Sequence, residues 1–118
     1  MDSPDWARPV VYFSIQAMDQ QKQRAFYSQL FNWNIADAPF MSIPAGPGSP
    51  ENGISGHIAP SKQPGFTLFV QVRNVHEALA RAVELGGAKV SDPFQVPNGP
   101  MIAGITDPEG NSLTLVQQ

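Results

Sequence analysis

The feature that most constrains this chain is a weak internal repeat at an offset of 55 residues. The segment YFSIQAMD at 12–19 aligns with TLFVQVRN at 67–74, and both alternate apolar and polar residues as a strand does. Each segment ends at a residue suited to cap a helix N-terminus, Asp19 in the first and Asn74 in the second. Because a repeat sets the architecture of a chain, the sequence predicts two similar halves.

A helix is predicted after each cap. The clearest signal follows Asn74, where apolar residues recur at helical spacing, so that one face of the helix can lie on a sheet: Val75, Ala78, Leu79, Ala82 and Val83. Gly86 and Gly87 then supply the left-handed conformation that ends a helix. In the first half, Asp19 predicts a helix over roughly 20–31.

Short strands are predicted after each helix. In the first half they lie at about 33–36, 40–43 and 54–59, and in the second at about 88–91, 101–106 and 112–116. The segment DPEGN at 107–111 has the residues of a type I turn and predicts a hairpin. Prolines in the loops 44–53 and 92–100 exclude central strands there, and we expect the loop 44–53 to form a rim.

Composition excludes several classes of protein. The chain has 118 residues, which is enough for one domain, and its ten acidic and seven basic side chains give a net charge of −3. The basic residues form no stripe, which disfavours nucleic-acid binding, and no apolar run is long enough to cross a membrane. The chain begins without signal-peptide features, so we expect a cytoplasmic protein. The absence of cysteine excludes disulfides, thiolate nucleophiles and cysteine-based metal sites.

Several motifs occur in an order that is typical of a known superfamily. They are D-x4-R-A-F-Y at 19–27, F-N-W at 31–33, G-I-S-G at 53–56, L-G-G at 85–87 and D-P-E-G-N-S-L at 107–113. Over about 9–117 the chain resembles the vicinal oxygen chelate superfamily, which includes glyoxalase I, extradiol dioxygenases and bleomycin-binding resistance proteins. It is most similar to the small glyoxalase-like proteins of bacteria.

The resemblance implies an α+β fold in which two βαβββ repeats curl a mixed sheet into a cup, with the helices on the convex face. It implies a single domain over 1–118, with repeat one at about 9–59, a linker at 60–66 and repeat two at about 67–117. It also implies a homodimer, because single-module relatives complete or flank their cups across a twofold axis.

In metal-dependent members, the resemblance implies one inward ligand from the first and last strand of each repeat, drawn from His, Glu and Gln. The matching positions here are Tyr12, Thr67, Thr114 and either Ser55 or His57, since one sequence does not fix the register of the last strand. Transition ions need imidazole, thiolate or carboxylate ligands, and only His57 qualifies. We therefore expect no metal ion and no cofactor.

Alternation along the strands predicts which side chains face the cup. Those expected to pack beneath the helices are Phe13, Ile15, Leu68, Val70, Val72, Leu113 and Leu115. Those predicted to bind a ligand are Tyr12, Ser14, Ser55, His57, Thr67, Phe69, Gln71 and Thr114. We expect Met101, Ala103 and Ile105 to add an apolar wall.

Three hypotheses for the function follow. In the first, a metal-free cup of hydroxyls, amides and aromatic rings binds a neutral or weakly polar organic molecule, as drug-sequestering relatives do. In the second, the protein is a glyoxalase-type lyase or isomerase that uses unforeseen metal ligands or transfers protons through His57 or Tyr12, of which His57 is the better base. In the third, the polar strand faces are merely solvated and the chain is a structural dimer partner.

Overall fold

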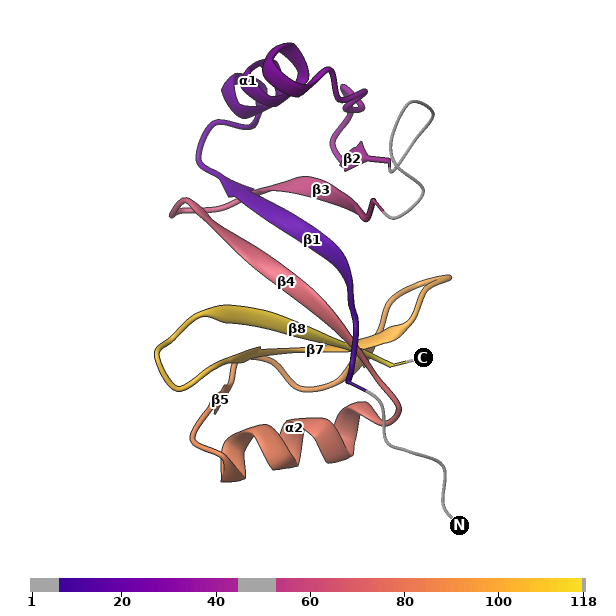
Figure 1. Cartoon of the computed structure of the whole chain (residues 1–118), viewed down its shortest axis with the longest axis vertical. Coiled ribbons are helices and arrows are strands. Elements are labelled where there is room, and N and C mark those ends of the chain that lie inside the picture. The colour runs from indigo at the N-terminus through magenta and orange to yellow at the C-terminus, as the bar shows by residue number, and fades with distance from the viewer. Residues whose placement is uncertain (1–6, 45–52, 118) are drawn as a thin grey trace. The chain divides into compact units, whose positions relative to one another are not determined.

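The computed structural model describes residues 7–44 and 53–117, so most of the predicted rim loop at 44–53 lies outside the described residues. The elements follow the order of strand, helix and further strands twice (Figure 1). They are β1 (Val10–Ala17), α1 (Gln20–Phe31), β2 (Met41–Ile43), β3 (Ser55–Pro60), β4 (Gly65–Val72), α2 (Val75–Glu84), β5 (Ala88–Lys89), β6 (Phe94–Gln95), β7 (Met101–Thr106) and β8 (Ser112–Gln117). This is the predicted α+β class, with βαβββ-like halves.

The chain divides into two compact units. The first unit comprises residues 11–68, and the second comprises residues 69–117 together with the described residues 7–10. The boundary falls inside β4, so the first unit holds the beginning of that strand and the second holds its end. Each unit has its own core and its own helix, and each is described by itself below.

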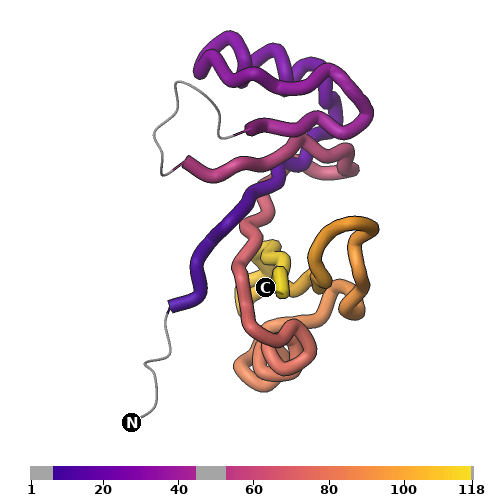
Figure 2. Tube along the Cα trace, turned by 90° about the vertical axis from the view of Figure 1, so that its right-hand side faces the viewer, coloured from indigo at the N-terminus to yellow at the C-terminus, as the bar shows by residue number. Residues whose placement is uncertain are grey.

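The first unit is a small mixed sheet covered by α1. Its strands have the order β2, β3, β1, with β3 parallel to β1 and antiparallel to β2. One face of these strands carries the core residues Ile15, Ala17, Met41, Ile43 and Ile58, and Ile35 joins this core from the loop after α1. Figure 2 shows α1 as a separate layer from the strands of this unit. The other face of the strands is therefore available for the polar side chains.

The ends of α1 have clear local causes. The carboxylate of Asp19 accepts a hydrogen bond of 3.0 Å from the backbone N–H of Lys22, and Asn32 ends the helix in the left-handed conformation, with φ of 60°. No residue of α1 is buried. Tyr27 packs against the core, and its ring stacks on Trp33 with centroids 5.5 Å apart. The helix is also held by Nε2 of Gln20, which donates to the carbonyl of Ile58 at 3.1 Å.

The second unit packs α2 against the hairpin of β7 and β8. Its core contains Val72, Val75, Leu79, Ala103, Ile105 and Leu115. The side chain of Asn74 caps α2 by accepting from the N–H of Glu77 at 3.0 Å, as predicted. At the hairpin turn, the carboxylate of Asp107 accepts from the N–H groups of Glu109 and Asn111, and Gly110 has φ of 93°. The predicted turn chemistry therefore builds this hairpin.

The prediction of a strand at 33–36 is wrong. This segment is a loop whose Ile35 side chain is buried and whose Ile35 carbonyl accepts from Nε of Arg24 at 2.9 Å. The N–H of Ala36 donates to the carbonyl of Ser42. The apolar alternation thus reflects packing against the core, while a side chain of α1 takes the carbonyl that a neighbouring strand would have paired.

The strand predicted at 88–91 is shorter than expected because a bulge ends it. The N–H groups of Val90 and Ser91 both donate to the carbonyl of Gly104, so two residues of one strand face one residue of the other. The hydroxyl of Ser91 accepts from the N–H of Gly104 at 2.8 Å. The connection between the repeats is also shorter than the predicted linker, because Pro60 belongs to β3 and Gly65 and Phe66 to β4.

Two predictions about strand faces need correction. Met101, Ala103 and Ile105 do not form a wall of the cup, because Ala103 pairs with Leu115 and both pack in the core with α2. Leu68 was expected beneath a helix but is 43% exposed. Leu68 belongs to the first unit, whereas α2 and the end of β4 belong to the second.

Candidate functional site

The first unit presents a polar face on the side of its strands opposite the core. It consists of Tyr12, Ser14, Gln16, Ser42, Ser55, His57 and Thr67, and we call these residues the polar face. Paired residues of adjacent strands share a face, so the pairs Tyr12–Ser55, Ser14–His57 and Ser42–His57 place these side chains together. The register of β3, which the sequence left open, therefore places Ser55 beside Tyr12 and His57 beside Ser14.

The imidazole of His57 joins two hydroxyl groups. Its Nδ1 lies 2.8 Å from the hydroxyl of Tyr12, and its Nε2 lies 3.4 Å from Oγ of Ser14. A neutral imidazole has one N–H group, so one ring nitrogen donates and the other accepts. Ser14 is itself buried. The three side chains therefore form a short hydrogen-bonded chain with His57 at its centre.

Burial shifts the pKa values of His57 and Tyr12 in the directions that favour their uncharged forms. Loss of solvent lowers the pKa of His57 below its usual value of 6.5 and raises the pKa of the Tyr12 phenol above its usual value of 10.0. At neutral pH, His57 is an uncharged imidazole and Tyr12 an uncharged phenol. No residue of the polar face carries a formal charge under these conditions.

A second hydrogen bond organises the other end of the polar face. The amide Nε2 of Gln16 donates to Oγ1 of Thr67 at 2.7 Å, and Thr67 is buried. This bond fixes the amide of Gln16, so that its remaining polar atoms have a defined direction. Thr67 lies at the start of β4, within the first unit.

Three residues of this surface, Gln16, Ser42 and Phe40, are absent from the predicted ligand-binding residues. Alternation along β1 places Gln16 on the same face as Tyr12 and Ser14. Ser42 lies between the core residues Met41 and Ile43 and beside His57, so alternation within β2 could have indicated it. Phe40 immediately precedes β2, and its ring centroid is 5.0 Å from that of His57, with 30° between the planes. The position of Phe40 depends on how β2 pairs with β3, which the sequence did not reveal.

The remaining predicted residues, Phe69, Gln71 and Thr114, belong to the second unit. Thr114 pairs with Gly104 and alternates with Leu113 and Leu115, so it faces away from the core. The backbone N–H of Gln71 donates to the carbonyl of Pro9 at 2.9 Å. The site is therefore built here from the first unit alone.

The side chains at the positions where the resemblance implies metal ligands do not suit a transition ion. Tyr12, Ser55 and Thr67 offer neutral hydroxyls, and burial makes the phenol harder to ionise. His57 is the one imidazole, and the described parts of the chain contain no group of three or more His, Cys, Asp or Glu side chains placed to hold a metal ion. The donor set does not fit the family's ion.

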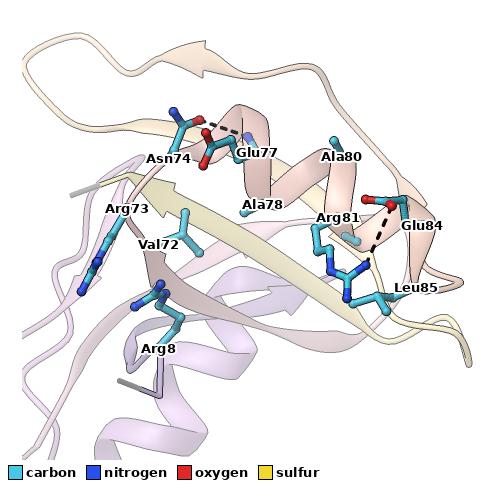
Figure 3. A pocket seen from close by; sticks show the side chains of 11 residues that line it. Arg8, Val72, Arg73, Asn74, Glu77, Ala78, Ala80, Arg81, Glu84 and Leu85 are labelled. Atoms are coloured by element: carbon cyan, nitrogen blue, oxygen red, sulfur yellow. Dashed lines mark hydrogen bonds and ion pairs between the residues drawn. The ribbon is translucent and has the colours of Figure 1, made fainter. Parts of the chain in front are cut away.

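A different hollow lies along α2 in the second unit, with a volume of about 810 Å³ (Figure 3). It is lined by Arg8, Val72, Arg73, Asn74, Glu77, Ala78, Ala80, Arg81, Ala82, Glu84 and Leu85. Here Nη1 of Arg81 lies 3.8 Å from Oε2 of Glu84, so charges of both signs line the hollow. Its chemistry differs from that of the uncharged polar face.

Among the described residues, no helix is long and apolar enough to cross a membrane.

Comparison with known proteins gives one family and several relatives. Residues 12–116 match the family model described as "Glyoxalase-like domain". The chain is 29% identical over 85 residues to the anthracycline biosynthesis protein DnrV of Streptomyces peucetius, covering 72% of this chain and 27% of that protein. It is 27% identical over 127 residues to the putative glyoxylase CFP32 of Mycobacterium bovis, covering 98% of this chain and 45% of that protein. The chain thus spans less than half the length of either.

Among solved structures, a glyoxalase/bleomycin resistance protein/dioxygenase superfamily member from Vibrio splendidus has the same fold. The TM-score is 0.66 at 11% identity, and the match covers 95% of this chain and 100% of that one. At this identity the likeness concerns the fold.

Proposed function

Because the chain belongs to the family of glyoxalase-like domains, we propose that its polar face binds a small uncharged organic molecule directly, without an intervening metal ion. The observation that supports this proposal is the chain of Tyr12, His57 and Ser14, in which one uncharged imidazole links two hydroxyls. Hydrogen-bonding groups fixed in this way favour a ligand with a hydroxyl or carbonyl group.

The absence of charge on the polar face supports the choice of an uncharged ligand. Binding a carboxylate or phosphate away from water requires a cation or several N–H donors, and the polar face carries mostly hydroxyl groups. A neutral ligand loses less hydration energy and can exchange hydrogen bonds with Ser42, Ser55 and the amide of Gln16.

A matched pair of ligands tests the proposal. We expect 2-naphthol, which is uncharged at pH 7, to bind more tightly than 2-naphthoate, which is an anion. Isothermal titration calorimetry with each compound measures the two dissociation constants. Tighter binding of the anion would contradict the proposal, and so would the absence of binding by both compounds at millimolar concentration.

Single substitutions test whether 2-naphthol binds at the polar face. His57→Ala should weaken 2-naphthol binding by about 3- to 10-fold, the value of one hydrogen bond. His76→Ala removes the other histidine, which is exposed at the start of α2, and serves as the matched control. Ser14→Ala provides a second, smaller change in case His57→Ala unfolds the protein. Equal effects of the two histidine variants would show that the ligand binds elsewhere.

A second candidate function is proton transfer, and the environment of His57 favours it. Because burial lowers its pKa, the imidazole is available at neutral pH to accept a proton from a carbon next to a carbonyl group. The electron pair of that C–H bond passes to the carbonyl oxygen to give an enolate, and the imidazolium returns the proton to the substrate. The hydroxyl of Tyr12, 2.8 Å from Nδ1, orients the ring. This activity would be of the isomerase or lyase type.

Hydrogen–deuterium exchange of a ketone tests the second candidate. In D₂O, wild-type protein should exchange the α-protons of 2-tetralone faster than His57→Gln does, with proton NMR as the measurement. His76→Gln controls for non-specific base catalysis. Equal exchange by wild type and His57→Gln would leave binding as the function. A purely structural dimer partner would instead neither bind 2-naphthol nor catalyse exchange.

A further inference from the structure

Phe40 extends the polar face with an exposed aromatic ring. Because Ser42 pairs with His57, Phe40 lies diagonally across from His57 on the same face of the strands. Tyr12 pairs with Ser55, so it is the diagonal neighbour of His57 on the other side. Strands β1 and β3, with the residue that precedes β2, thus place the rings of Tyr12, His57 and Phe40 in one diagonal row.

The distances between the rings show that Phe40 and Tyr12 each contact the imidazole of His57. The ring centroids of Phe40 and His57 are 5.0 Å apart with 30° between the planes, and those of Tyr12 and His57 are 5.4 Å apart with 37°. These separations lie within the range of attractive aromatic pairs. The imidazole is therefore bordered by a ring on each side.

The backbone holds Phe40 in this position. The N–H of Ser42 donates to the carbonyl of Phe40 at 3.1 Å, which makes a three-residue turn directly before β2. The ring nevertheless remains 60% exposed. An aromatic ring left largely open to water beside a few placed hydrogen-bonding groups is typical of a surface that binds a small molecule.

We propose that Phe40, His57 and Tyr12 form an aromatic platform that selects planar aromatic ligands carrying a hydroxyl or carbonyl group. This inference rests on the proposed function and adds the class of ligand to it. A planar ring can stack on Phe40 while its oxygen bonds to the hydroxyls beside His57. A saturated ligand of the same size can make the hydrogen bond but not the ring stacking.

Two compounds with the same carbon skeleton test the platform. We expect 2-naphthol to bind about 3- to 10-fold more tightly than decahydro-2-naphthol, which has one hydroxyl on two saturated rings. Phe40→Leu keeps an apolar side chain and removes the ring, so it should reduce this ratio to near one. Competition calorimetry on the full chain measures both dissociation constants.

Phe66→Leu is the matched control. Phe66 is 62% exposed and lies in the same unit, but it neighbours Thr67 in β4 and points to the opposite face of the strand. Phe66→Leu should leave the ratio of the two dissociation constants unchanged. Equal affinities of the two alcohols in wild type, or equal effects of the two variants, would overturn the platform while leaving the proposed function intact. Absence of binding by both alcohols would overturn the proposed function and the platform together.

Discussion

His57 couples the polar face to pH. Its pKa in the folded protein is lowered by burial, whereas in the unfolded chain a histidine titrates near ~6.5. Between these two pKa values the unfolded state binds more protons, so the free energy of unfolding rises with pH. The stabilisation is complete above about 6.5 and is lost as the pH falls through that value toward the folded-state pKa.

We therefore predict that the wild-type protein is less stable at about pH 5.5 than at about pH 7.5, and that His57→Gln reduces this difference. Urea unfolding of both proteins at the two pH values measures it. NMR titration of the imidazole signals that disappear in the variant gives the pKa of His57 directly. A value at or above 6.5 would contradict the prediction.

Gly56 determines how closely β3 approaches β1. A Cβ atom at this position would lie 2.5 Å from the carbonyl oxygen of Phe13 and 2.7 Å from its ring. We predict that Gly56→Ala lowers the free energy of unfolding by about 1–3 kcal/mol, the usual cost of overpacking. Gly104→Ala is the control, because its Cβ would meet no backbone atom among its nearest neighbours, which are the Ser91 hydroxyl at 3.3 Å and side-chain atoms of Val90 at 3.4 and 3.6 Å.

Urea unfolding at pH 7.5 compares the two glycine variants. A loss for Gly56→Ala no larger than that for Gly104→Ala would show that β1 and β3 separate easily. Because Gly56 precedes His57, such a separation would also loosen the contact between His57 and Ser14. The glycine of the G-I-S-G motif thus has a packing role beside the site.

At the scale of elements, the cap of α2 should matter more than that of α1. Asn74 holds the N–H of Glu77, and the helix that it begins buries Val75 and Leu79. Loss of the cap therefore weakens a helix that is part of the core. No residue of α1 is buried, so that helix is tied less strongly to the unfolding of its unit.

We predict that Asn74→Ala lowers the free energy of unfolding by about 1 kcal/mol, whereas Asn74→Asp, which keeps an accepting oxygen, costs little. Asp19→Ala in α1 should cost less than Asn74→Ala. Urea unfolding monitored by circular dichroism measures all three. The reverse order for the two alanine variants would contradict this account of how the helices are anchored.

The elements could be predicted where local chemistry decides them. Asp19 and Asn74 indicated both helices, and Asp107 indicated the hairpin of β7 and β8. The strand prediction at 33–36 was wrong because Ile35 packs against the core from a loop. The apolar pattern of this segment therefore reflects burial alone. The bulge at Gly104 depends on the pairing of two distant segments, which no local pattern reveals.

In the candidate site, too, the features set by local patterns could be predicted, and the contacts between strands could not. Alternation placed Tyr12 and Ser14 on one face of β1, and their pairing with β3 brings Ser55 and His57 to the same face. Phe40 escaped prediction because its contact with His57 requires the register between β2 and β3. Strand registers are set by tertiary packing, so the contacts across strands were the part that the sequence could not supply.

At the scale of the whole molecule, the family establishes the fold and leaves the chemistry to the residues on the strands. Residues 12–116 match the glyoxalase-like domain. The positions where the resemblance implies metal ligands are occupied here mainly by hydroxyl side chains. We propose, as the family resemblance implies, that the chain forms a homodimer. Sedimentation equilibrium tests this, with the monomer mass as the contrary result.

The central claim is that the polar face binds its ligand without a transition ion. Protein purified without chelators and analysed by inductively coupled plasma mass spectrometry tests it most directly. The account predicts zinc, nickel, manganese and iron contents far below one ion per chain, and equal contents in wild type and His57→Ala. One equivalent of any of these ions in the wild type, lost in His57→Ala, would contradict it.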